Sequence, residues 1–320
     1  MSIHVRPIGP GDDAALAEYV RIRSSVAPDD ADSAEQVAWE DATYPGQVWR
    51  YLADLDGAAA GTCTTGRLHI HGPDHPRFYL GLWVLPERRG HGAGTALYLA
   101  ASEAARAAGK SGFQTWVSEA QADGVRFLLG RGFTVTGRDK VVSLGLRGLD
   151  APEPAPPAGI TLVTLAEQPD LVPGIHAAAV EAYPSIPSMT PIQPGSLDEF
   201  NAADVEAVGM AKDAFVVALD GTTGEVAGYA NLKLAQGGAP FAYQHMTAVR
   251  PAWRGRGIAT AMKRATIACA VRAGLEELRT GNDEQNAPMR AVNARLGYRP
   301  RADYLALHGP LAPGPAGPGA

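Results

Sequence analysis

The chain has 320 residues, of which 46% are hydrophobic and 19% charged, and its formal net charge is −6 at pH 7. This is the composition of a globular protein long enough for two domains, and the acidic balance argues against a nucleic-acid scaffold. No apolar run is long enough to cross a bilayer, and the segment 1–7 lacks a signal-peptide apolar region. We therefore expect a cytoplasmic protein without a membrane partner. The excess of Arg over Lys, with abundant Ala, Gly and Pro, indicates a bacterial source.

Hydrophobic periodicity and turn residues predict a mixed α/β plan for the first half of the chain. In order, we expect a strand over 3–8, a helix capped by Asp12 or Asp13, a helix over 33–42, strands over 48–54, 58–68 and 78–85, a helix ending near 108, a strand over 113–118, a helix over 121–131, and strands over 133–136 and 140–146.

The segment 150–159 is a Pro-rich linker, and the second half repeats the plan after it. We expect a strand over 160–165, a helix containing Leu171 and Ile175, a Pro-rich loop over 183–191, a helix over 197–208, and strands over 214–219, 225–234 and 241–249. The predicted domains are therefore 1–149 and 160–311, followed by a disordered Ala/Gly/Pro tail over 312–320.

The cysteines and a group of three histidines could indicate thiol chemistry or a metal site. Cys63 and Cys269 are the only cysteines and fall at apolar positions, so we expect buried thiols. His69, His71 and His75 lie in one Gly/Pro-containing hairpin loop. Because metal ligands usually come from more than one element, we expect no metal site there.

The central motif follows the strand that ends at Val249. A Pro is followed by a turn and then by an Ala-rich helix; the turn and helix start read Arg254, Gly255, Arg256, Gly257, Ile258, Ala259, Thr260. Free backbone N–H groups at such a helix N-terminus, glycines that allow close approach and two arginines suit a phosphate or pyrophosphate.

The same motif occurs after Val84. Its residues are Arg89, Gly90, His91, Gly92, Ala93, Gly94, Thr95. The offset is constant, since 249 − 84, 257 − 92 and 297 − 132 all give 165, which indicates an internal duplication. Neither copy has the Gly-Lys-Ser/Thr of a P-loop, and the dinucleotide-binding pattern does not fit because Arg precedes the glycines.

Arg89-x-x-Gly92-x-Gly94 and Arg254-x-x-Gly257-x-Ala259 resemble the acyl-coenzyme A pyrophosphate loop of the GNAT acyltransferase superfamily. The resemblance covers nearly the whole chain and implies two tandem GNAT folds, each a mixed central sheet flanked by helices, in a plan similar to that of the mycothiol synthases. It also implies acetyl-coenzyme A (acetyl-CoA) as the acyl donor.

The resemblance assigns further roles. A backbone N–H near Val249 or Val84 would hold the thioester oxygen, and the acidic general base of the family, four residues earlier, corresponds to His245 and Leu80. Imidazole can accept a proton near neutrality, whereas Leu cannot; a packed core histidine is the alternative for His245.

The family tyrosine that protonates the thiolate corresponds to Asn293 and Leu128, neither of which is Tyr. We therefore expect either water or Asn293, the third candidate catalytic residue beside His245 and Val249, to assist the departing thiolate. Asn286 matches the family asparagine that bonds the pantetheine arm, with a helix cap as the alternative; Gln121 is its partner in the first half.

These assignments predict chemistry in the second half and a catalytically degenerate first half. We expect an N-acetyltransferase acting on the primary amine of a small molecule, as a monomer or homodimer without nucleic acid. A non-catalytic CoA-binding protein and a peptide or protein N-acetyltransferase are the alternatives.

Overall fold

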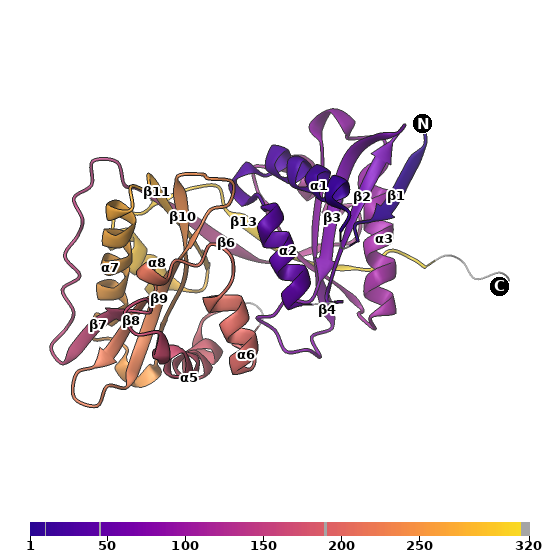
Figure 1. Ribbon diagram of the computed structural model, residues 1–320. Helices are drawn as coiled ribbons and strands as arrows, with labels where there is room; N and C mark the ends of the chain where they lie inside the picture. Colours follow the sequence, from indigo (N-terminus) through magenta and orange to yellow (C-terminus); the bar gives the residue numbers. More distant parts are fainter. Residues whose placement is uncertain (10, 45, 189–190, 315–320) are drawn as a thin grey trace. The chain divides into compact units, whose positions relative to one another are not determined.

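The computed structural model describes residues 1–9, 11–44, 46–188 and 191–314, and its elements can be followed in Figure 1. The chain divides into two compact units. Unit 1 comprises residues 1–68, 73–136 and 304–320, and unit 2 comprises residues 69–72 and 137–303. None of the helices in the described part of the chain combines the length and apolar character needed to cross a lipid bilayer.

Unit 1 contains a mixed sheet in the order β1-β2-β3-β4-β5-β13, in which only β4 and β5 run parallel. Its elements are β1 (Ile3–Pro7), α1 (Asp13–Val26), α2 (Ala34–Thr43), β2 (Val48–Leu55), β3 (Ala58–Gly66), β4 (Arg77–Val84), α3 (Ala93–Ala107), β5 (Gly112–Ser118), α4 (Ala122–Leu129) and β13 (Tyr304–Pro310). Asp12 caps α1 as expected, because its side chain accepts from the backbone N–H of Ala15 at 3.0 Å.

The strands of unit 2 lie in the order β6-β11-β10-β9-β8-β7, with β12 on β6, and only β10 and β11 run parallel. Its elements are β6 (Thr134–Gly145, which enters unit 2 at residue 137), β7 (Ile160–Thr164), α5 (Val172–Ala182), α6 (Leu197–Phe200), β8 (Val216–Asp220), β9 (Val226–Leu234), β10 (Phe241–Val249), α7 (Ile258–Arg272), β11 (Glu277–Asp283), α8 (Ala287–Arg295) and β12 (Arg299–Pro300).

The units differ from the predicted domains 1–149 and 160–311 in their last strands. β13, the final strand of the chain, pairs with β5 in unit 1, and β6 pairs with β11 in unit 2 along Asp139–Gly145. Each sheet is thus completed by a strand from the other half of the sequence. Strand pairing over such separations is set by long-range contacts that a local pattern does not encode.

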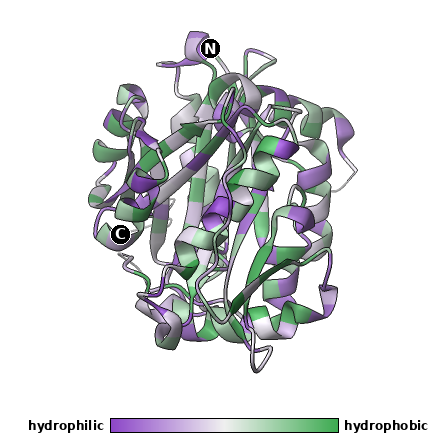
Figure 2. Cartoon of the chain, turned by 90° about the vertical axis from the view of Figure 1, so that its left-hand side faces the viewer, coloured by the Kyte–Doolittle hydropathy of each residue, from purple (hydrophilic) through white to green (hydrophobic). Residues whose placement is uncertain are grey.

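Helices cover both faces of each sheet, and hydrophilic residues recur along them beside hydrophobic ones (Figure 2). In unit 1, Thr64 contacts Tyr19 of α1, whereas its neighbour Cys63 contacts the carbonyl of Leu97 in α3. Successive strand residues point to opposite faces, so α1 and α3 lie on opposite sides of β3. Cys63 is a buried free thiol, as expected, and Cys269 is a half-buried one.

In unit 2, β9 separates two core clusters. Tyr229 packs with Ile175 and Ala179 of α5, and its neighbour Ala230 packs with Ile258 and Met262 of α7. The face of β9 and β10 under α5 is called the α5 face below. It corresponds to the face of β3 and β4 under α1.

Three local expectations were wrong. The strands predicted over 133–136 and 140–146 form one strand, β6. The helix predicted over 197–208 is α-helical only over Leu197–Phe200 and continues as a π-helix over Asn201–Val205. In the predicted tail, Ala312 is buried and its N–H donates to Ser102 Oγ at 2.9 Å, because it packs on α3; residues 315–320 lie outside the described residues.

Candidate functional site

The two glycine-rich loops have the same backbone conformation. After β10, a 3-10 turn (Pro251–Trp253) leads to Gly255 and Gly257, whose φ angles are 76° and 86°. Gly257 is the N-cap of α7 and provides no side-chain cap. The N-terminal N–H groups of α7 therefore face an exposed loop in which a side chain would be strained.

The loop after β4 repeats this geometry. Gly90 and Gly92 have φ angles of 77° and 91°, and Gly92 is the uncapped N-cap of α3. Arg89 Nε donates to the carbonyl of Val84 at 3.2 Å. Arg254 Nε makes the equivalent bond to Val249 at 2.9 Å. Each arginine thus ties its loop to the last residue of the central strand.

The other predicted loop residues occupy matching environments. Arg256 and His91 are exposed, Ile258 and Ala93 are buried, and Ala259, Thr260, Gly94 and Thr95 are half-buried or exposed.

The two loops differ at the glycine that caps the following helix. A Cβ placed on Gly255 or Gly257 would meet no atom within 4 Å. A Cβ on Gly92 would lie 2.9 Å from Ile3 Cδ1, so the side chain of Ile3 covers the corresponding position in unit 1. The hydroxyl of Thr95, in the first turn of α3, also accepts from Arg131 Nη2 at 2.5 Å.

In both units the two parallel strands separate beyond their first residues. β10 pairs with β11 only as far as Tyr243 and Arg279. Just beyond, Thr280 Oγ1 donates to the carbonyl of Gln244 at 3.1 Å, and the strands make no further ladder pairs. β4 and β5 separate in the same way after Tyr79. The separation leaves the last residues of β10 free to face a ligand on that side.

A β-bulge distinguishes β10 from β4. The pairing of β10 with β9 shifts register between Gln244 and Thr247, whereas β4 pairs with β3 without interruption from Tyr79 to Val84. The N–H of Met246 in the bulge donates to Asn231 Oδ1 at 2.8 Å. The side chain of Asn231 thereby replaces a ladder bond that the extra residue disrupts.

The bulge changes one sequence equivalence. A glycine lies opposite the last valine of each central strand: Gly61 of β3 opposite Val84, and Gly228 of β9 opposite Val249. Four residues further along β3, Thr65 lies opposite Leu80. Four residues further along β9, Leu232 lies opposite Gln244. The constant offset had matched Leu80 with His245. The structural counterpart of Leu80 is Gln244, and His245 belongs to the inserted bulge.

His245 projects from this bulge with 38% of its side chain exposed, which rules out the alternative of a packed core histidine. Its Nε2 lies 3.6 Å from Asp204 Oδ1, in the π-helix. Sequence reasoning missed Asp204, which is one of four acidic residues in the helix predicted over 197–208 and has no local pattern that singles it out.

The two predicted asparagines lie at opposite ends of α8. Asn286 is its N-cap, and its Oδ1 accepts from the N–H of Met289 at 3.3 Å, so it makes the helix-capping contact. Asn293 is buried, and its Nδ2 donates to Asn282 Oδ1 at 2.7 Å at the end of β11. Asn293 Oδ1 has no hydrogen-bond partner among the described residues.

Comparison with known proteins decides the family. The model of the acetyltransferase (GNAT) family matches residues 15–133 and again 180–298. The chain belongs to this family. It is an N-acetyltransferase that uses acetyl-CoA, with two GNAT folds in tandem. The two matches begin in α1 and shortly before the end of α5, and each includes one glycine-rich loop.

Solved structures of similar proteins share the whole plan. A tandem GNAT protein from the clavulanic acid biosynthesis pathway is 20% identical, with a TM-score of 0.78 over 98% of this chain and 100% of that one. A GCN5-related N-acetyltransferase from Sphaerobacter thermophilus is 21% identical, with a TM-score of 0.70 over 98% and 97% of the two chains. Both likenesses concern the fold. No functionally curated protein matches the chain.

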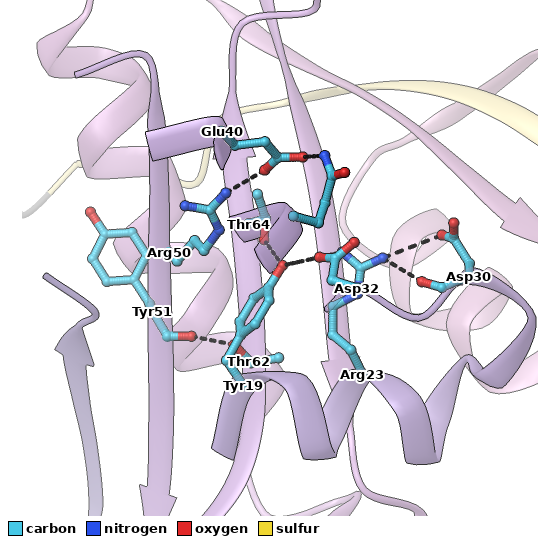
Figure 3. A network of polar contacts seen from close by, with 10 residues as sticks. Tyr19, Arg23, Asp30, Asp32, Glu40, Arg50, Tyr51, Thr62 and Thr64 are labelled. Atoms are coloured by element: carbon cyan, nitrogen blue, oxygen red, sulfur yellow. Dashed lines mark hydrogen bonds and ion pairs between the residues drawn. The ribbon is translucent and has the colours of Figure 1, made fainter. Parts of the chain in front are cut away.

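In the GNAT fold of unit 1, a polar network joins α1 to β2 and β3 (Figure 3). Tyr19 hydroxyl donates to Asp32 at 2.8 Å, and Arg23 forms an ion pair with the same carboxylate at 2.9 Å while its guanidinium lies 3.9 Å from the Trp83 ring centre. Burial, followed by the charge of Asp32, raises the pKa of Tyr19. This network corresponds in position to the α5 face and presents guanidinium groups with their paired carboxylates rather than an imidazole.

A second network that sequence reasoning missed lies beneath β10 of unit 2. Gln244 Nε2 donates to Thr266 Oγ1 at 2.7 Å, and Tyr298 hydroxyl donates to Gln244 Oε1 at 2.7 Å. Lys263 is buried, with its ammonium 5.5 Å from the Tyr298 ring centre, and burial lowers its pKa to about 7. These groups fix the strand just before the bulge. A lysine at an apolar position of α7 was the available signal.

The histidine loop has a structural role. His71 Nδ1 lies 3.0 Å from the carbonyl of Pro191, and the N–H of Gln193 donates to the carbonyl of Ile70 at 2.8 Å. Within the described ranges, no group of three or more His, Cys, Asp or Glu side chains could hold a metal. The loop instead contacts Pro191, the last residue of the Pro-rich loop of unit 2, and Gln193 just after it.

Proposed function

We propose that the enzyme transfers the acetyl group of acetyl-CoA to the primary amine of a small molecule, and that the chemistry occurs in unit 2. The observation that carries this proposal is the exposed His245 on a bulge of β10, at the point where β10 and β11 separate. The continuous β4 of unit 1 has no counterpart of this bulge residue.

The loop of unit 2 fits the pyrophosphate of acetyl-CoA. The open positions over Gly255 and Gly257 let phosphate oxygens approach the backbone, and the uncapped N-terminus of α7 supplies donors of matching charge. Arg256, on the exposed surface between the two glycines, adds a positive charge. Bound acetyl-CoA would supply the reactive thioester.

The residues of unit 2 would then divide the remaining work. The imidazole of His245 accepts the proton that the attacking amine loses. A backbone N–H near Val249 stabilises the thioester oxygen. Asn293, whose Oδ1 has no described partner, orders the polar groups at the start of α8 through Asn282 rather than acting as an acid, since an amide does not release its proton.

The test measures thiol release from acetyl-CoA with and without a panel of small amines and peptides, and identifies the acetylated product by mass. Transfer to small primary amines, with a lower turnover in His245→Ala and little change in KM for acetyl-CoA, is the expected result. Binding of acetyl-CoA without transfer to any acceptor would favour the non-catalytic alternative, and transfer to peptides alone would favour the peptide acetyltransferase.

A further inference from the structure

The π-helix over Asn201–Val205 brings a carboxylate to the base. The N–H of Glu206 donates to the carbonyl of Asn201 at 2.8 Å, five residues earlier, so this turn is wider than an α-helical one. Phe200 and Val205 remain buried in the core of the α5 face. The extra residue in the turn allows Asp204 to face β10 between these two anchors. Such π-turns occur frequently at functional sites.

Asp204 is in an environment that calls for a partner. Only 15% of its side chain is exposed, and His245 is its only ion-pair partner among the described residues. An ionised carboxylate at this depth is costly to hold without a positive or hydrogen-bonding group. The imidazole of His245 is therefore placed to compensate it once it takes up a proton.

Two buried tyrosines lie within electrostatic reach of the same carboxylate. Tyr183 and Tyr229 bond to each other through their hydroxyls at 2.6 Å. Burial raises the pKa of Tyr183, and the charge of Asp204 raises it further. The pKa of Tyr229 is raised first by burial, then by Tyr183, and then by the charge of Asp204. Both hydroxyls stay protonated, so neither adds a competing negative charge beside His245.

We infer that Asp204 is a positioning residue that holds the imidazole of His245 in the tautomer needed for proton transfer. The inference rests on the proposed function. With Nε2–H directed at Asp204 Oδ1, the lone pair is on Nδ1. The N–H bond of the attacking amine breaks as the Nδ1–H bond forms, and Asp204 stabilises the resulting imidazolium without taking a proton.

The separation of 3.6 Å between Nε2 and Oδ1 is longer than a hydrogen bond. Catalytic contacts of this kind are often long in unliganded enzymes and shorten when substrate is bound. The inference therefore concerns the complex with acceptor, in which the dyad closes.

A double-mutant cycle tests the inference through turnover. The single variants are His245→Ala, Asp204→Asn, which removes the charge at constant shape, and Asp204→Glu, which restores it. Asp198→Asn is the matched control, because Asp198 is an exposed acid on α6 in the same segment. kcat, KM for acetyl-CoA and the melting temperature are measured for each variant and for the double variant His245→Ala/Asp204→Asn.

We expect His245→Ala to lower kcat by about 10²–10⁴-fold, the usual contribution of a general base. Asp204→Asn should lower kcat by at least about tenfold with KM for acetyl-CoA unchanged, and it should have almost no further effect in the His245→Ala background, since residues that act as a unit are not additive. Asp204→Glu should recover part of the lost turnover, and Asp198→Asn should match the wild type.

Three results would overturn the inference. If Asp204→Asn lowers kcat by the same factor in both backgrounds, Asp204 does not act through His245. If Asp204→Asn changes only the melting temperature and leaves kcat unchanged, the role of Asp204 is structural, and Asp204→Glu has no lost turnover to restore. If the wild type transfers acetyl groups and His245→Ala slows it while Asp204→Asn does not, this inference fails and the proposed function stands; a wild type without transfer to any acceptor removes both.

Discussion

Replacing Gly257 by Glu tests whether the unit 2 loop binds the pyrophosphate. Gly257 has a φ of 86°, and a side chain there would enter the open space above the N-terminus of α7. The new carboxylate would occupy the place of a phosphate oxygen and repel the remaining charges. At about 4 Å and an effective dielectric constant of about 20, one such repulsion is worth about 4 kcal/mol. This corresponds to a loss of nearly three orders of magnitude in acetyl-CoA affinity.

Gly274→Glu is the control for backbone strain. Gly274 follows the other end of α7, has a φ of 72°, and a Cβ there would also meet no atom within 4 Å. Both substitutions place an L-residue in the left-handed region, at a shared cost of roughly 1–2 kcal/mol in folding free energy. Only Gly257→Glu should raise KM for acetyl-CoA in the thiol-release assay, while the two melting temperatures should fall together.

Gly92→Glu makes the same change in unit 1. There the substituent would collide with Ile3, so we expect reduced stability with most of the turnover retained. Equal loss of activity in Gly257→Glu and Gly274→Glu would refute the pyrophosphate assignment. A folded but inactive Gly92→Glu beside an active Gly257→Glu would show that the chemistry belongs to unit 1.

Three further predictions concern the intact enzyme. Acetyl-CoA at one hundred times its Kd should stabilise the native state by about 2.7 kcal/mol, so the melting temperature should rise; no rise at millimolar ligand would contradict binding. Burial lowers the pKa of Lys263 from 10.5 to about 7, so between these pH values the lysine binds a proton in the unfolded chain but not in the native one. The free energy of unfolding should therefore fall as the pH is lowered from 10.5 to 7. Lys263→Met should reduce this slope in urea titrations, and an unchanged slope would assign it to other groups. Arg23→Met leaves the Asp32 carboxylate without its cationic partner and should cost about 3–5 kcal/mol of unfolding free energy without lowering kcat, whereas a loss of turnover at unchanged stability would give unit 1 a catalytic role.

Local chemistry explains what could be predicted from the sequence. The bounds of β10 were predicted correctly, and a helix was expected after the glycine-rich turn, because Pro251 and the glycines interrupt the pattern at this point. The duplication made the second loop equally predictable. Both glycine-rich loops consist of residues that are close together in the sequence, and the resemblance to the GNAT superfamily depends on these loops.

What could not be predicted depends on contacts between distant residues. The bulge that carries His245 is closed by Asn231, and a constant sequence offset gives no sign of the inserted residue. The apolar spacing around Phe200 fits an α-helix and a π-helix almost equally well, so Asp204 was not placed near β10. The site roles of His245 and Asn286 remain predictions.

The exchange of β6 and β13 has a consequence for synthesis of the chain on the ribosome. The sheet of unit 1 needs β13, which is translated last, so most of unit 1 must wait with the edge of β5 unpaired while the whole of unit 2 is made. An open strand edge is a site for wrong pairing, so the nascent chain passes through a stage in which chaperone binding at this edge would be useful. If the nascent chain were cleaved in the Pro-rich linker, neither fragment could complete its own strand pairing, because β6 would be separated from β11 and β13 from β5.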